Sequence, residues 1–128
     1  PQSGPAIRDR HQVPMAELVL ASLHPRWSSM PEVAVRRPVR GWIDLVLHDP
    51  VARDLVSTEL ESGLRRIEQL LRWSTEKAQA LPSADGWRDW LDGGHEPTVS
   101  RLLVVRWTRA NREATAAARR VRAKPAGR

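Results

Sequence analysis

Cysteine, phenylalanine and tyrosine are absent from this chain of 128 residues. Without cysteine the chain has no disulfide framework, no thiolate ligand for zinc and no cysteine nucleophile. Without phenylalanine or tyrosine, the six tryptophans must supply all of the aromatic packing. Thiol chemistry is therefore excluded, and carboxylates become the first candidates for a functional site.

Long apolar runs are also missing from the sequence. No stretch approaches the roughly 20 residues that a membrane-spanning helix needs, and no signal-peptide pattern is present. We therefore expect a cytoplasmic protein without a membrane partner. The length suffices for one domain with its own core. Because the sequence begins with Pro1 rather than Met, we expect a longer parent chain with a further domain.

Lysine is nearly absent. Lys77 and Lys124 are the only lysines among the 21 basic residues, and the formal net charge is +6. The remaining basic residues are arginine, whose planar guanidinium group binds phosphate through paired hydrogen bonds. The composition favours a nucleic-acid partner, although an arginine bias can also reflect a GC-rich genome.

Apolar periodicity and the positions of proline and glycine predict one α/β domain at 14–121, between a flexible lead-in at 1–13 and a basic tail at 122–128. Three helices are predicted, at 14–24, 62–81 and 108–121. Four strands are predicted, at 32–37, 41–48, 54–61 and 101–107. The last strand has an unbroken apolar centre, which is typical of a strand buried on both faces. Because a helix connects the third and fourth strands, we expect that pair to be parallel in a mixed four-stranded sheet.

The second and third strands are the most informative segment, because Asp-Pro turn chemistry between them predicts a hairpin. If Asp44 lies opposite Glu59, strict alternation places Asp44, Glu59 and Glu61 on one face. Ile43 and Leu47 then lie on the other, apolar face. Carboxylates that lie so close together repel one another, and they remain ionised only near a cation.

Two interpretations of this acidic face stay open. The carboxylates bind a metal ion, or they form a solvated surface whose charge is balanced by Arg40 and Arg65.

The predicted order of one helix, three strands, helix, strand and helix (αβββαβα) supports a resemblance to a known group. With an Asp on the second strand and an acidic triplet on the third, the chain resembles the PD-(D/E)XK nuclease superfamily, which shares the restriction-endonuclease-like core. The similarity spans about Glu17 to Arg120. The segments RGWIDLVLHDP and ELESGLRRIEQLLRW further resemble the C-terminal domain of actinobacterial helix-turn-helix (XRE-type) regulators.

The resemblance implies a site that binds Mg²⁺ or Mn²⁺. Its metal ligands are expected to be Asp44, Glu59 and the main-chain carbonyl of Leu60, with Glu17 as a further acidic residue. Glu61 stands where the superfamily has a lysine.

Gln69 completes the expected catalytic set of Asp44, Glu59 and Glu61. With Trp73 it is similar to the Q-x-x-x-Y motif of the RecB-like branch of the superfamily. The arginines that we expect to contact DNA are Arg36, Arg37, Arg40, Arg65, Arg109 and Arg112.

Three functions remain open. The first is a nuclease-like, DNA-associated domain of a transcriptional regulator, with weak or lost phosphodiesterase activity because Glu61 cannot supply the positive charge of lysine. The second is an active Mg²⁺-dependent endonuclease, and the third is a non-catalytic protein-interaction module. The expected partners are DNA and a helix-turn-helix domain in the same parent chain. The sequence leaves open whether copies of the chain form a homo-oligomer.

Overall fold

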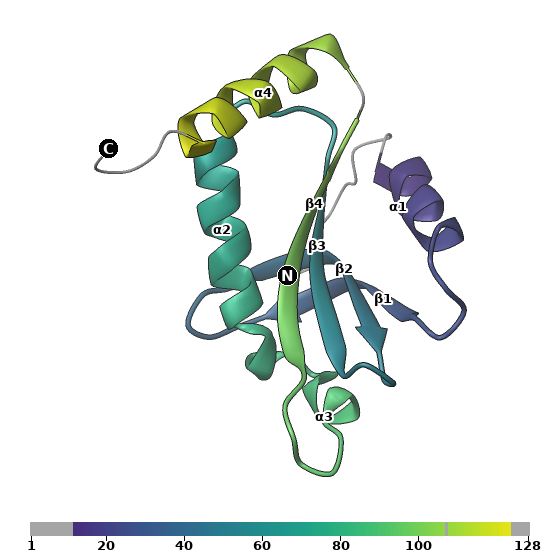
Figure 1. Ribbon diagram of the computed structural model, residues 1–128. Helices are drawn as coiled ribbons and strands as arrows, with labels where there is room; N and C mark the ends of the chain where they lie inside the picture. Colours follow the sequence, from purple (N-terminus) through teal and green to yellow (C-terminus); the bar gives the residue numbers. More distant parts are fainter. Residues whose placement is uncertain (1–11, 107, 124–128) are drawn as a thin grey trace, which may run out of the picture.

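The computed structural model describes residues 12–106 and 108–123. The elements are α1 (Gln12–Ala21), β1 (Ser28–Val35), β2 (Gly41–Asp49), β3 (Asp54–Glu61), α2 (Ile67–Gln79), η1 (Leu81–Ser83), α3 (Trp87–Trp90), β4 (Thr98–Val105) and α4 (Arg109–Ala123). The predicted α/β class and αβββαβα order are confirmed, with the short helices η1 and α3 added between α2 and β4 (Figure 1).

Several predicted boundaries shift by a few residues. Residues 12–13 of the predicted lead-in and 122–123 of the predicted tail are helical, while 1–11 and 124–128 lie outside the described residues. β1 begins at Ser28 rather than at residue 32, and includes Pro31, because β1 is an edge strand where a missing N–H is tolerated. In the described part of the chain, no helix is long and apolar enough to cross a membrane.

The four strands form one mixed sheet in the order β1-β2-β3-β4. The first two pairs are antiparallel, and β3 and β4 are parallel, as the helical connection predicted. Leu47 pairs with Val56 in the β2–β3 ladder, which is the predicted register. Extending that ladder from its last pair, Leu45 and Thr58, by one residue places Asp44 opposite Glu59.

The predicted burial of β4 on both faces is wrong. β4 pairs only with β3 and is therefore an edge strand, and its residues are exposed or half-buried. Leu102 has a relative exposure of 40%. On the side toward α2, the exposed Arg101 of β4 donates hydrogen bonds to Thr75 Oγ1 and to the carbonyl of Leu71.

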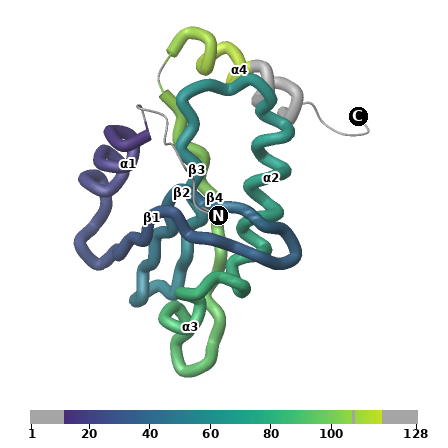
Figure 2. Tube along the Cα trace, turned by 180° about the vertical axis from the view of Figure 1, so that it is seen from behind, coloured from purple at the N-terminus to yellow at the C-terminus, as the bar shows by residue number. Residues whose placement is uncertain are grey.

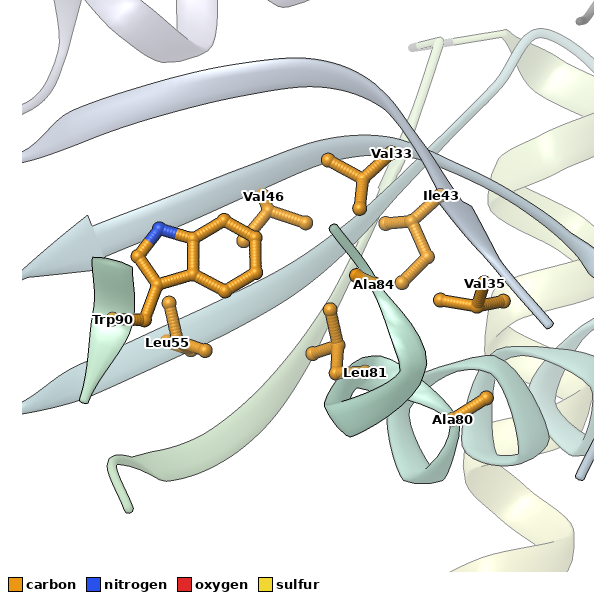
Figure 3. Close-up of a cluster of buried hydrophobic side chains, with 9 residues drawn as sticks. All are labelled: Val33, Val35, Ile43, Val46, Leu55, Ala80, Leu81, Ala84 and Trp90. Carbon is orange, nitrogen blue, oxygen red and sulfur yellow. The ribbon is translucent and has the colours of Figure 1, made fainter. Parts of the chain in front are cut away.

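The helices lie on both sides of the sheet. In the two opposite views α1 and α2 stand on different sides of the β3–β4 pair, and α4 lies across the end of α2 at which that helix begins (Figures 1 and 2). The main core cluster fills the α2 side near η1 and α3 (Figure 3). Its buried members are Val33, Val35, Ile43, Val46, Leu55, Ala80, Leu81, Ala84 and Trp90.

The expectation that Ile43 shares the apolar face with Leu47 is corrected by this cluster. Ile43 packs in the same cluster as Val46, three residues away, so the strict alternation of β2 breaks between them. The β1–β2 ladder skips the pair Glu32 and Asp44, and Glu32 has a left-handed φ of 54°. This local irregularity occurs at Asp44, where the candidate site begins.

The turn between β2 and β3 is fixed by Asp49, whose side chain is buried. Its Oδ1 accepts hydrogen bonds from the backbone N–H groups of Val51 and Ala52, and its Oδ2 lies 2.7 Å from Arg26 Nε. The hydrogen bond from Arg26, with the two from the backbone, holds the pKa of Asp49 below its ordinary value of 3.8. The predicted Asp-Pro turn thus has a charged anchor that fixes the hairpin register.

Candidate metal centre

Three carboxylates meet where β2 and β3 lie side by side. Asp44, Glu59 and Glu61 each place one carboxylate oxygen within 4.8 Å of the others, as the hairpin register predicted. This acidic cluster can hold a metal ion. Asp44 is oriented by its Oδ2, which accepts a hydrogen bond of 2.8 Å from the backbone N–H of Leu60.

Glu59 is the most unusual member of the acidic cluster, because its side chain is only 8% exposed. Its Oε1 lies 2.7 Å from Lys77 Nζ, while its Oε2 is buried and has no hydrogen-bond partner among the described residues. Buried carboxylate oxygens normally have partners, because desolvation without compensation is costly. A cation beside Oε2 would supply the missing compensation.

The pKa of Glu59 is raised from 4.5 to about 7. Burial is the main cause, since it disfavours the charged carboxylate, and the charges of Asp44 and Glu61 add to it. Lys77 opposes the shift through its charge and its hydrogen bond. Lys77 therefore compensates only part of the effect of burial on Glu59.

Lys77 was not predicted as a site residue, yet it is the cation that the structure places at the acidic cluster. It lies on α2 with a side chain 5% exposed, and Nζ also donates a 2.7 Å hydrogen bond to the carbonyl of Trp42. A signal was present in the sequence. One of the chain's two lysines falls on the buried stripe of a helix, beside Ser74 and Ala78.

Gly41 leaves the space through which the Lys77 side chain reaches the acidic cluster. A Cβ atom at position 41 would lie 3.2 Å from Lys77 Cδ and 3.4 Å from Trp73 Cζ2. Lys77 Nζ in turn lies over the Trp73 ring, 5.8 Å from its centroid, which is within the range of a cation–π contact.

A cleft of about 1050 Å³ opens beside the acidic cluster. Glu61 lines it, as do the segment after β3 and the exposed side of α2, including Gln69. The structure therefore brings Gln69 to the same cleft as a member of the acidic cluster. Arg65, another predicted site residue, lines this cleft as well.

The wall of the cleft after β3 is not helical, although the sequence predicted a helix from residue 62. The reason is Asn111 of α4, which is 3% exposed. Its Oδ1 accepts a hydrogen bond from the N–H of Leu64, and its Nδ2 donates to the carbonyls of Ser62 and Arg106. These bonds hold residues 62–64 in a non-helical segment, and α2 begins only at Ile67.

Two predicted metal ligands lie in other surroundings. Glu17 is exposed on α1 and does not belong to the acidic cluster. The carbonyl of Leu60 accepts a 2.7 Å hydrogen bond from Gln12 Nε2. A carbonyl oxygen has a second lone pair, so the ligand role of Leu60 stays a prediction.

The other predicted arginines lie outside the cleft. Arg36 pairs with Asp85, and the backbone N–H groups of Arg36 and Arg37 donate to Ser83 Oγ, which ties their loop to η1. Arg40 is exposed and precedes Gly41. On α4, Arg109 pairs with Glu113, and Arg112 is exposed.

The alternative in which arginine balances the acidic face does not describe Glu59. Its ion-pair partner in the described structure is Lys77, and both side chains are buried rather than solvated.

Comparisons of the chain with family models, with curated proteins and with solved structures gave no match.

Proposed function

We propose that this chain is a divalent-metal-dependent phosphodiesterase domain that acts on nucleic acid, of the PD-(D/E)XK type that its sequence resembles. The observation that supports this most directly is the carboxylate of Glu59. This carboxylate is buried, and its Oε1 pairs with Lys77. Its Oε2 has no hydrogen-bond partner among the described residues, and a carboxylate oxygen each of Asp44 and Glu61 lies within 4.8 Å of one of its oxygens.

The donor set fits Mg²⁺ or Mn²⁺. All three side chains offer hard carboxylate oxygens, which these ions prefer, and together they supply enough negative charge for a divalent cation. When bound, such an ion lowers the pKa of a water molecule and offsets the charge of a phosphate group.

Each residue then has a distinct part. Asp44 and Glu59 hold the ion, and the Leu60 N–H keeps Asp44 oriented. Glu61 is half-buried and lines the cleft, so it is placed to accept a proton from the attacking water. Lys77 acts through Glu59 as a positioning residue, because its hydrogen bond fixes Oε1 and leaves Oε2 for the ion.

This assignment departs from the expectation of weak or lost catalysis, which rested on Glu61 in place of lysine. Lys77 brings a positive charge to the same carboxylates from α2, so we propose that hydrolysis is retained. The relation to helix-turn-helix regulators and to transcription stays a prediction from the sequence. The interaction-module alternative has less support, because a carboxylate as buried as that of Glu59 cannot contact a protein partner.

The test measures metal binding and hydrolysis separately. We expect Mn²⁺ to raise the melting temperature, because at a hundredfold excess over its dissociation constant it stabilises the folded state by about 2.7 kcal/mol. We also expect Mn²⁺ to support cleavage of DNA. Asp44→Asn should abolish both effects, because it removes a ligand. Glu96→Gln removes an exposed carboxylate elsewhere and should change neither.

Lys77→Met separates positioning from metal binding. We expect the metal-induced rise in melting temperature to persist while cleavage falls at least tenfold. Wild-type protein that is neither stabilised by Mn²⁺ nor able to cleave DNA would overturn the proposal.

A further inference from the structure

The cleft beside the acidic cluster has the chemistry of a nucleotide-binding surface. Its basic residues are Arg65, Arg66 and Arg72, and the side chains of all three are exposed. None of them forms an ion pair within 4.0 Å in the described structure, although Arg66 Nη1 makes a long hydrogen bond of 3.5 Å to Gln69. Three guanidinium groups that have no ion-pair partner among the described residues and line one concave surface favour the binding of a polyanion.

The spacing of these residues aligns them along α2. The cleft residues on α2 lie at helical spacing and share one face: they are Gln69 and the residues three, four and seven positions after it, Arg72, Trp73 and Glu76. Arg65 and Arg66 precede the first turn of the helix. The cleft begins at Glu61, which also belongs to the acidic cluster. A strand whose phosphates lie along these arginines therefore reaches the carboxylates at one end.

Trp73 adds a flat apolar surface to this basic cleft. Its side chain is 40% exposed, although tryptophan is the only aromatic residue available for the core. Lys77 Nζ lies over the ring, and a Cβ atom added at Gly41 would lie 3.4 Å from the ring atom Cζ2. The ring is thus held in place by its buried contacts, and its exposed part lines the cleft.

We infer that this cleft receives an unpaired nucleotide, with its base stacked on Trp73 and its phosphates bound by Arg65, Arg66 and Arg72, and that single-stranded nucleic acid is the preferred substrate. The inference rests on the proposed function and names the substrate class for it. A base in an intact duplex is already stacked on its neighbours, so it reaches an indole ring only after unpairing. A single strand binds without that cost.

Binding of a fluorescently labelled oligonucleotide, measured by anisotropy in EDTA at low salt, tests the inference without metal or hydrolysis. We expect the single strand to bind more tightly than the same sequence annealed to its complement. Stacking contributes about 1 to 3 kcal/mol per base, so Trp73→Ala should weaken single-strand binding roughly 5- to 150-fold. Trp73→Tyr should restore most of it, which a purely structural role of the indole would not predict.

Two arginine variants form the matched control for charge. Arg72→Ala and Arg88→Ala each remove one exposed arginine, and only Arg72 lines the cleft. We expect Arg72→Ala alone to weaken binding at physiological salt. Melting temperatures measured in parallel identify any variant that fails to fold.

The outcomes separate this inference from the proposed function. Equal or tighter duplex binding, or full affinity in a folded Trp73→Ala protein, would overturn the inference, and Mn²⁺-dependent stabilisation would still stand as the test of the metal site. Single-strand binding that depends on Trp73, in a protein that Mn²⁺ does not stabilise, would support the cleft and refute the metal-dependent function.

Discussion

Glu59 shows how one residue can be costly for stability and still be the centre of a site. Its side chain is buried beside two other carboxylates, and Lys77 is its hydrogen-bond donor in the described part of the chain. A buried ion pair rarely stabilises a fold more than apolar packing would, because both charges lose hydration. A bound divalent cation would give a reason for such a pair, because hard cations are bound by oxygen ligands such as carboxylates.

The raised pKa of Glu59 predicts the sign of a pH effect in metal-free protein. Because the folded pKa of about 7 exceeds the ordinary value of 4.5, the folded state retains the proton in this interval while the unfolded state loses it. The contribution of Glu59 to stability is therefore largest below pH 4.5, falls as the pH rises to 7, and is constant above that. The total change is at most about 3 kcal/mol.

Urea unfolding of wild type and Glu59→Gln in EDTA, at pH 5 and at pH 8, measures this effect. The difference in free energy of unfolding, wild type minus variant, should decrease between the two pH values. The folded pKa of Asp49 is lowered, so its contribution to stability is lost as the pH falls, which is the opposite sign. Asp49 is present in both proteins, so its contribution cancels in the difference. A difference that does not change with pH would contradict the assigned burial of Glu59.

At the scale of elements, α2 depends on a residue far away in the sequence. Asn111 makes three hydrogen bonds that hold the segment before α2 and the end of β4. Leu64, whose N–H is one of these partners, is 47 residues from Asn111. The wall of the cleft is therefore fixed by packing of α4, and not by the helical propensity of residues 62–66.

Asn111→Ala is expected to lower the free energy of unfolding by about 2 to 4 kcal/mol, because it leaves backbone groups of Ser62, Leu64 and Arg106 without their partner. Chemical denaturation measures this loss. Arg109→Ala on the same helix removes an exposed ion pair and should change stability by less than about 0.5 kcal/mol. A similar small effect for Asn111→Ala would show that the segment is held by other contacts.

Local patterns in the sequence were sufficient for the type and order of the main elements and for the hairpin. Asp-Pro turn chemistry and alternation fixed the register of β2 and β3, so the acidic cluster was predicted correctly from Asp44, Glu59 and Glu61. The edge position of β4 was missed, because an apolar run does not reveal how many neighbouring strands pair with it.

Lys77 and Asn111 were missed for a related reason. Each acts through partners that are distant in the sequence, 18 residues away for Glu59 and 47 for Leu64. A lysine on a buried helical stripe was a usable signal, because such a charge needs a partner. Asn111 lies on a helix rich in alanine and arginine, and no local pattern marks it as buried.

The whole molecule has a formal net charge of +6, and a net positive charge favours the approach of a polyanion before any contact forms. Long-range attraction depends on the total charge of the protein and is screened by salt. The binding of a phosphate group depends in addition on the position of the basic side chain that contacts it. Arg40 and Arg88 allow these contributions to be separated. Both are exposed, but Arg40 directly precedes Gly41, where an added Cβ atom would meet the side chains of Trp73 and Lys77.

We expect oligonucleotide affinity to fall steeply as salt rises. If Arg40 contacts a phosphate group, Arg40→Glu should lower the affinity at physiological salt and flatten the dependence of log K on log salt. Arg88→Glu makes the same change in net charge and should lower the affinity only at low salt. Titrations at several salt concentrations measure both slopes, and identical behaviour of the two variants would exclude Arg40 from the binding surface.

The Asn111 contact also sets the order in which the site is completed during translation. The hairpin with its three carboxylates is synthesised first, and residues 62–64 follow directly. Their final conformation waits for Asn111, which is made much later. A nascent chain therefore contains the acidic hairpin before the wall of the cleft after β3 can take its final conformation.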